Sequence, residues 1–215
     1  MWLFSLFIAY SSPDSFSLAK MFSHAGVVHC IGLLFDDASG LGNLNRFVSG
    51  SGSLPDSEST YDSITRKSAF NAIDATVDYV QEKGLVGTDF PFVFISAAEA
   101  GWPDVPGGKQ VEQYLAPDWL RRYLVAKRSV EARLKEVEEQ SLLRPIMPRP
   151  SLVYSLDRPA SYLPVGAFFV GNRIGLPFVD RPVTVQSLAN AIVRSISQPS
   201  VRNVLRYEQI DDLSQ

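Results

Sequence analysis

The sequence of 215 residues contains a single cysteine, Cys30, and only two histidines. One cysteine excludes a disulfide bond within the chain and favours a reducing compartment. His24 and His29 do not combine with Cys30 in the spacing of a zinc site, so the sequence predicts no metal site. His29 lies in an apolar run, where a histidine is more often packed than a ligand. Asp36 and Asp37 follow that run and are typical of a solvated turn.

Runs of basic residues are also missing. The chain has 20 Lys and Arg against 23 Asp and Glu, which gives a formal net charge of −3 with the two signs interspersed. Because nucleic-acid binding requires a basic stripe or patch, nucleic acid is not a predicted partner.

The sequence has no apolar run of transmembrane length. The apolar start, "MWLFSLFIAYSS", is too short to span a bilayer, so no transmembrane segment is predicted. It also lacks the basic residues of a signal peptide and the arginines of a mitochondrial presequence. A buried strand, or a start codon inside a longer gene, explains this run as well as any targeting role does.

A glycine-rich phosphate-binding turn is missing as well. Neither "GSGSLP" at 50–55 nor "PGGKQ" at 106–110 fits a dinucleotide-binding turn or a P-loop. The first has no strand before it and no helix after it, and the second has no Ser or Thr after its lysine. Around Ser96 the residues are "FISAA", which is not the nucleophile elbow of a hydrolase.

What the sequence does contain is an α/β pattern. Its 46% hydrophobic and 20% charged residues are enough for the core of one domain. Strands are predicted at 26–32, 91–96 and about 147–153, helices at 61–82 and 118–140, followed by "RPVTV", "QSLANAIVRSI" and "RNVLRYEQI" as strand, helix and strand. Alternating strands and helices are typical of a parallel sheet. We expect the first three strands to be adjacent and parallel, with both long helices on one face.

The predicted helix "RRYLVAKRSVEARL" carries a lysine on its apolar side. At about 100° per residue, Tyr123, Lys127 and Glu131 fall within the arc of its leucines, whereas its arginines face solvent. An unpaired buried lysine costs several kcal/mol. Either Lys127 reaches solvent or pairs with Glu131, or its ammonium lowers the pKa of the Tyr123 phenol, which could then shuttle a proton near neutral pH.

The surroundings of this pair resemble the short-chain dehydrogenase/reductase superfamily, in its extended and atypical branches. In that family a strand ends in a serine followed by small residues, as in "FVFISAAEAG", and Tyr-x-x-x-Lys follows on the next helix. Ser96 and Tyr123 are 123 − 96 = 27 positions apart, as in extended members. "AGVVHCIG" is similar to the family's fourth strand, "YDSITRKSAFNAIDA" to the next helix and "IMPRPSLVYS" to the later Arg-Pro strand. The resemblance covers roughly residues 11 to 208.

The resemblance implies a partial Rossmann-like parallel sheet with flanking helices, lacking the first βαβ nucleotide-binding unit. One truncated domain would span residues 1–215, with the sheet core at about 11–150 and substrate-side elements at about 151–215. The implied cofactor is NAD or NADP. Because the glycine-rich turn normally holds the pyrophosphate at a helix N-terminus, we expect this chain to bind the cofactor weakly, in the millimolar range.

The family's site residues can be carried over to this sequence. By resemblance, Tyr123 would be the general acid/base, Lys127 would lower its pKa and bind the nicotinamide ribose, and Ser96 would hydrogen-bond the substrate oxygen. Thr65 stands where the family usually has an asparagine. The residues implied in cofactor binding are Gly32, His29, Lys127, Arg149 and Pro150.

Within the superfamily, "VVHCIGLLF" and "RRYLVAKRSVE" most resemble the mitochondrial atypical members. These include a fungal group linked to coenzyme Q biosynthesis and, more distantly, the 39-kDa-type accessory subunit of respiratory complex I. The resemblance implies a mitochondrial oxidoreductase of ubiquinone metabolism with a quinone or quinone-precursor ligand. The apolar stretch at 164–178 would be core or would face an isoprenoid tail. The alternatives are a non-catalytic assembly or structural protein of a mitochondrial complex, and an inactive fragment.

Overall fold

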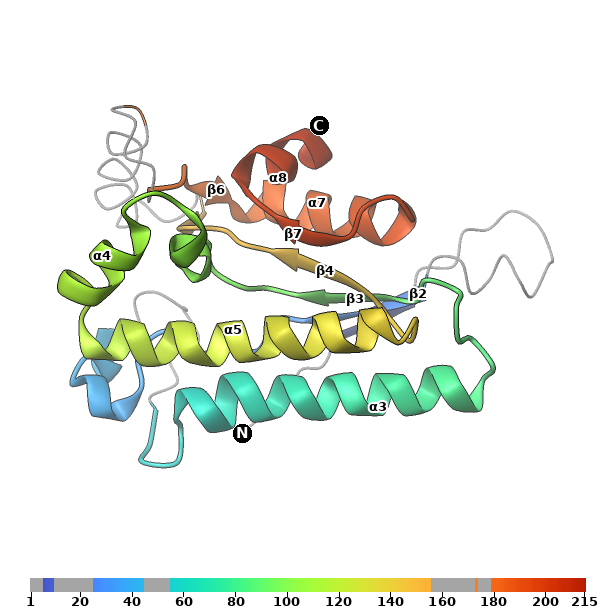
Figure 1. The fold of residues 1–215 in the computed structure, drawn as a ribbon, viewed down its shortest axis with the longest axis horizontal. Coiled ribbons are helices and arrows are strands. Elements are labelled where there is room, and N and C mark those ends of the chain that lie inside the picture. Colours follow the sequence, from blue (N-terminus) through green and yellow to red (C-terminus); the bar gives the residue numbers. More distant parts are fainter. Residues whose placement is uncertain (1–5, 10–24, 45–54, 156–172, 174–178) are drawn as a thin grey trace.

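The computed structural model describes residues 6–9, 25–44, 55–155, 173 and 179–215. Its centre is a five-stranded sheet in the order β1-β2-β3-β4-β7, with helices on both faces (Figure 1). The strands are β1 (Leu6–Ala9), β2 (Ala25–His29), β3 (Pro91–Phe94), β4 (Arg144–Pro148) and β7 (Asn203–Leu205). From β2 to β7 each strand is parallel to its neighbour. The chain therefore has the predicted α/β class and a partial Rossmann-like fold.

The three strands predicted to be adjacent are neighbours in the sheet. Val28 of β2 is paired with Val93 of β3, which is paired in turn with Ile146 of β4. This order and the parallel direction confirm the prediction. The third strand begins at Arg144, earlier than the predicted 147, because the backbone N–H of Arg144 already bonds to the Phe90 carbonyl at 2.8 Å.

Helices α3 (Ser68–Glu82) and α5 (Asp118–Glu139) lie on one face of the sheet, as predicted (Figure 1). Ile73 of α3 and Val130 of α5 are fully buried and join Phe92 of β3 in one core cluster. The apolar side of each helix therefore faces the sheet, and burial of such side chains contributes about 1.5–3 kcal/mol each.

Helices α7 (Val185–Ser197) and α8 (Tyr207–Ser214) pack on the opposite face. Val93 belongs to their cluster together with Leu188 of α7. It follows Phe92 in the chain, and consecutive residues of a strand point to opposite faces. Strand β3 is buried on both sides, which explains its continuous apolar run.

Strand β1 closes one edge of the sheet. It pairs antiparallel with β2, with Leu6 opposite Val28 and Ala9 opposite Ala25. An uncovered apolar strand would offer its unpaired N–H and C=O groups to other chains. The described residues that precede β2 form this strand and no helix, so no βαβ unit lies among them.

The helix predicted at 61–82 has two parts. The first, η3 (Tyr61–Lys67), has π-helical hydrogen bonds. It is capped by Thr60, whose hydroxyl accepts a hydrogen bond from the Ser63 N–H at 3.1 Å. Helix α3 continues it without a break. Short π segments inside helices are frequent at functional sites.

The end of the chain differs from the prediction. The stretch "RNVLRYEQI" was predicted as one strand, but only Asn203–Leu205 is extended and α8 follows. The N–H of Arg206 donates to the Gln209 side chain at 2.9 Å, which caps the helix. Ile210 is fully buried in the core against α7, so packing rather than local propensity decides its conformation.

The remaining elements are short. They are the 3-10 helices η1 (Asp37–Ser39), η2 (Gly42–Leu44) and η4 (Ala98–Asp104), the helix α4 (Gly108–Tyr114), and the parallel strands β5 (Val153–Tyr154) and β6 (Val183–Thr184). None of the helices in the described ranges combines the length and the apolar character that a membrane crossing needs. The predictions for the aromatic stretch at 164–178, apart from Arg173, and for the glycines of 50–54 lie outside the described residues.

Candidate functional site

Lys127 lies on the buried side of α5, beside the carboxyl end of β3. It is 5% exposed, and its Nζ donates a hydrogen bond to the Ile95 carbonyl at 2.6 Å. The same nitrogen lies 4.8 Å from the centre of the Phe94 ring and 5.5 Å from that of Tyr123. Burial lowers the pKa of Lys127 to about 8, against the opposing effect of nearby acidic groups. The predicted inward orientation is therefore confirmed.

Glu131 does not supply the ion pair that one interpretation of Lys127 required. Its carboxylate accepts two hydrogen bonds from Arg149, from Nε at 2.9 Å and from Nη2 at 2.6 Å. Both side chains are nearly buried. Among the ion pairs of the described residues, none includes Lys127, so the i,i+4 pairing prediction is wrong.

Ser96 and His29 bring unsatisfied polar atoms to the same region. Ser96 follows β3, is 3% exposed, and its Oγ has no hydrogen-bond partner among the described residues. His29 ends β2, and its Nε2 lies 3.2 Å from Ser68 Oγ while its buried Nδ1 has no partner there. Burial, and then the charge of Lys127, lower the pKa of His29 to about 4, so the imidazole is neutral at neutral pH. Buried polar groups are normally hydrogen-bonded, so such atoms are candidates for ligand contacts.

The other predicted site residues separate into two groups. Gly32 lies beside the ammonium, because a Cβ built on it would be 3.6 Å from Lys127 Nζ. Arg149 and Pro150 instead follow β4, where the Pro150 carbonyl accepts a hydrogen bond from the Ala98 N–H at 3.0 Å. Thr65, at the place of the family's asparagine, is fully buried, and its Oγ1 has no partner in the described part of the chain.

Tyr123 packs against Tyr61 of η3, with ring centres 5.7 Å apart in an edge-to-face arrangement. Burial is the largest effect on its phenol and raises its pKa well above the usual value, and Glu99 and Tyr61 act in the same direction. The predicted lowering of the Tyr123 pKa by Lys127 is therefore wrong for this arrangement of residues. The reason is that burial disfavours the charged phenolate, and the nearby Glu99 and Tyr61 disfavour it further.

The loop after β2 docks on the start of α5. Asp36, interpreted from the sequence as part of a solvated turn, is only 4% exposed and pairs with Arg122 at 3.1 Å. The Tyr61 hydroxyl donates to the Leu34 carbonyl at 2.8 Å. Asp36 and Arg122 are 86 positions apart, so the local sequence did not indicate their ion pair.

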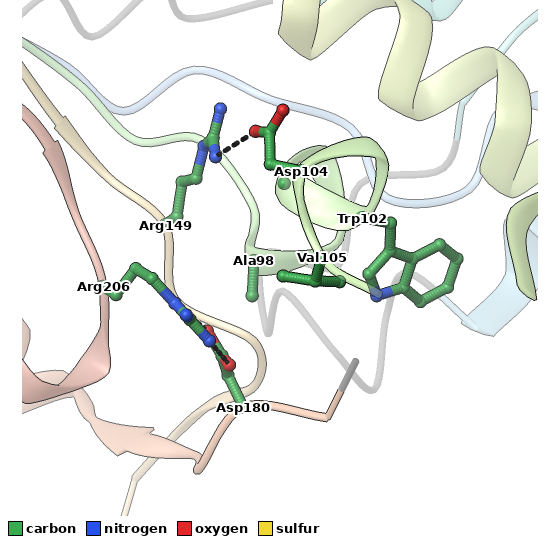
Figure 2. A pocket seen from close by; sticks show the side chains of 8 residues that line it. Ala98, Trp102, Asp104, Val105, Arg149, Asp180 and Arg206 are labelled. Atoms are coloured by element: carbon green, nitrogen blue, oxygen red, sulfur yellow. Dashed lines mark hydrogen bonds and ion pairs between the residues drawn. The ribbon is translucent and has the colours of Figure 1, made fainter. Parts of the chain in front are cut away.

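A pocket of about 230 Å³ lies where β3, β4 and β7 end (Figure 2). Its lining is Ala98, Gly101, Trp102, Asp104, Val105, Arg149, Asp180 and Arg206. In open α/β sheets ligands bind outside the carboxyl ends of the strands. Of these residues, only Arg149 was predicted from the sequence as a site residue. Arg206 directly follows the last residue of strand β7, and this position could have indicated it as a second pocket residue.

Glu99 is a further acidic group that the sequence analysis did not select. Burial, and then the charge of Asp180, raise its pKa to about 7. Its charge also acts on the Tyr123 phenol. Within the described ranges, no group of three or more His, Cys, Asp or Glu side chains is placed to hold a metal ion.

Comparison with known proteins adds one structure. No family model and no curated protein matches the sequence. Among solved structures, RMD from Pseudomonas aeruginosa, determined in complex with NADPH, is similar with 15% sequence identity and a TM-score of 0.46. The match covers 83% of this chain and 56% of that protein, so the chain spans little more than half of its length. No family follows from this similarity.

Proposed function

We propose that the chain is an NAD(P)-binding, oxidoreductase-like protein in which Ser96, Tyr123 and Lys127 face the nicotinamide end of the cofactor. The observation that carries this proposal is the buried ammonium of Lys127. An ammonium has three donors, and Lys127 uses one of them for the Ile95 carbonyl. Two N–H groups therefore have no acceptor among the described residues. The two hydroxyls of a ribose would supply acceptors for them.

The surrounding residues fit such a ligand at its nicotinamide end. Gly32 has no side chain to fill the space beside Nζ, and Ser96 Oγ and His29 Nδ1 are buried without partners. The nicotinamide would supply or accept a hydride. The raised pKa of Tyr123 keeps its phenol protonated at neutral pH. In this form Tyr123 holds the proton that reduction of a substrate oxygen requires, and its raised pKa makes it a weaker acid than an ordinary phenol.

The substrate and the compartment rest on the sequence resemblance alone. By that resemblance we propose a quinone or a quinone precursor as the substrate, in a mitochondrial setting. Membership of a mitochondrial protein complex is the corresponding proposal for a protein partner.

One observation favours a second candidate, a non-catalytic member of the same fold. The Tyr123 ring is covered by Tyr61, and its pKa moves away from neutrality. A structural role would retain this packing without turnover. The exchange Tyr123→Phe separates the two candidates. If Tyr123 donates the proton, the wild type oxidises NADH with a short-chain quinone and Tyr123→Phe does not. If the wild type itself shows no turnover, the result favours the non-catalytic candidate.

Saturation-transfer NMR with NADH or NADPH at millimolar concentration tests the binding mode. We expect transfer to be strongest at the protons of the nicotinamide ribose and to fall in Lys127→Met. Lys135→Met is the matched control, because Lys135 lies on the same helix but is exposed. No transfer, or transfer that Lys127→Met leaves unchanged, contradicts the proposal.

A further inference from the structure

Two arginines lie side by side at the carboxyl edge of the sheet. Pro148 of β4 is paired with Leu205 of β7, and Arg149 and Arg206 are the next residues of the two strands. The N–H of Arg149 donates to the Leu205 carbonyl at 2.8 Å, so the pairing continues to this point. Both side chains line the pocket (Figure 2). The parallel register therefore places two arginine side chains at one small cavity, with the guanidinium of Arg149 directed toward Asp104 and that of Arg206 toward Asp180 (Figure 2).

Each guanidinium is held from one edge by a buried carboxylate. Arg149 uses Nε and Nη2 for Glu131, and Arg206 uses the same two nitrogens for Asp180. The side chains of these acids are only 5% and 8% exposed. Bidentate pairs fix the plane of a guanidinium as well as its position. The Nη1 nitrogens make no hydrogen bond to any residue that the structure describes.

The Nη1 nitrogen of Arg149 faces a carboxylate, that of Asp104. This carboxylate lies 3.7 Å from the nitrogen, beyond hydrogen-bond distance, and the Asp104 side chain is 75% exposed (Figure 2). An exposed carboxylate at this separation is weakly held. Gly101 makes room for the arginine, because a Cβ at this position would lie 2.7 Å from Nη1.

The rest of the lining limits the ligand. Ala98, Val105 and Trp102 supply the apolar part of the lining, with Trp102 farthest from the arginines (Figure 2). The volume of about 230 Å³ lies below the roughly 300–1,000 Å³ of pockets for drug-sized ligands, so the cavity is too small to enclose a dinucleotide. A small organic molecule with one polar end fits the size of the pocket and its lining, which is charged on one part and apolar on the other.

We propose that this pocket binds the oxyanion group, a carboxylate or a phosphate, of a small molecule whose apolar body rests against Trp102 and Val105. The two Nη1 groups bind the oxyanion, and Asp104 is displaced outward. Arg206 and Arg149 are thereby positioned to select an acidic ligand. If the ligand is the substrate of the proposed function, that substrate is an acidic small molecule. Binding of an oxyanion in the pocket does not itself depend on the proposed function.

Calorimetric titration of the full chain without any dinucleotide tests the pocket. The probes are benzoate, its neutral analogue benzamide, and inorganic phosphate. We expect benzoate to bind about tenfold or more tightly than benzamide, because only the former makes charge-assisted hydrogen bonds. If phosphate competes with benzoate, the pocket recognises both phosphate and carboxylate groups. If phosphate does not compete, the pocket recognises carboxylates alone.

Variants with opposite expected signs make the test specific. Arg206→Gln weakens benzoate binding by about tenfold, whereas Asp104→Asn tightens it by about threefold because a competing carboxylate is removed. The control is Arg202→Gln, which removes an exposed arginine that pairs with Asp89 and Glu138. Asp104 is exposed, so its exchange tests the pocket even if Arg206→Gln does not fold.

Equal binding of benzoate and benzamide, no binding of either, or unchanged benzoate affinity in Asp104→Asn overturns the pocket assignment. The NMR experiment with NAD(P)H depends on Lys127 and is unaffected by these results. Ribose contacts without benzoate binding therefore overturn only this inference. Benzoate binding without ribose contacts overturns only the proposed function.

Discussion

Lys127 is a cation held in an apolar environment by the packing around it. Phe94 and Tyr123 lie near its ammonium, one carbonyl accepts a hydrogen bond from it, and Glu131, the nearest acid along the helix, is bound to Arg149. The charged form is consequently disfavoured, and the pKa lies at about 8. A group of this kind lowers stability while it is charged, and functional groups are commonly found in such positions.

The stability contribution of Lys127 therefore depends on pH. Between the folded pKa of about 8 and the ordinary value of 10.5, the unfolded chain binds more protons than the folded chain. The free energy of unfolding consequently rises with pH in that window. We expect the stability of the wild type relative to Lys127→Met to increase from pH 8 to pH 10 in urea denaturation.

Lys135→Met is the control for this prediction. Lys135 is exposed on the same helix, so its exchange should change stability by an amount that does not depend on pH over that range. A difference between wild type and Lys127→Met that is flat or falls with rising pH contradicts the burial of the ammonium.

At the scale of elements, Arg144 connects the start of β4 with the end of α7. It is 2% exposed, and its guanidinium donates to the carbonyls of Ser195 at 3.0 Å, Ile196 at 2.8 Å and Gln198 at 3.1 Å. The last carbonyls of a helix have no intrahelical partner. One buried arginine therefore caps α7 and fixes it to the sheet.

Replacing Arg144 by Met should destabilise the fold strongly. The exchange leaves several buried carbonyls without donors, at about 1–3 kcal/mol for each that water does not reach, and we expect a loss of about 3–5 kcal/mol in the free energy of unfolding. Arg194→Met is the matched control, since Arg194 lies on α7 and is exposed, and it should change stability by less than about 0.5 kcal/mol. Chemical denaturation of both variants measures this, and a loss as small as that of the control refutes the capping role.

At the scale of the whole molecule, the described sheet has four parallel strands and one antiparallel edge strand. The carboxyl ends of β2 and β3 carry residues that we propose to face the ribose, and those of β4 and β7 carry the arginine pocket. The described helix that begins at a glycine pair, α4 with Gly107 and Gly108, follows the 3-10 helix η4 and not a strand, unlike the glycine-rich turn that holds a pyrophosphate. The proposed cofactor contacts among the described residues are therefore confined to the nicotinamide end.

We therefore expect this 215-residue chain to bind NADH or NADPH with a dissociation constant in the millimolar range or weaker. The few contacts at the nicotinamide end must still offset the loss of translational and rotational freedom, which costs at least about 4 kcal/mol. Calorimetric titration at high cofactor concentration measures the constant. A micromolar value would show that contacts outside the nicotinamide end hold the cofactor.

The periodicity of the sequence was sufficient for several features of the site. Apolar runs and helical periods predicted the strand neighbours and the helices of one face, because crossovers between parallel strands have one hand. The inward position of Lys127 followed from helical geometry alone. Ser96 could be placed at a strand end because small residues follow it.

Other features depend on residues that are far apart in the chain. The raised pKa of Tyr123 comes from its burial with Glu99 and Tyr61, neither of which its own helix indicates. A buried strand was only one of the interpretations of the N-terminal residues, and the structure decides that β1 pairs with β2. Burial and pairing partners are set by packing, and a local pattern does not contain them.

The sequence by itself determined the α/β class, the buried lysine and the serine at the end of a strand, because these follow from local period and composition. Only the tertiary structure decided that Glu131 binds Arg149 instead of Lys127, and that Arg149 and Arg206 share a pocket. The physical reason is that a parallel sheet places residues 57 positions apart (206 − 149) at the same edge. Hydrogen-bond register and desolvation then set which charges are paired and which remain available to a ligand.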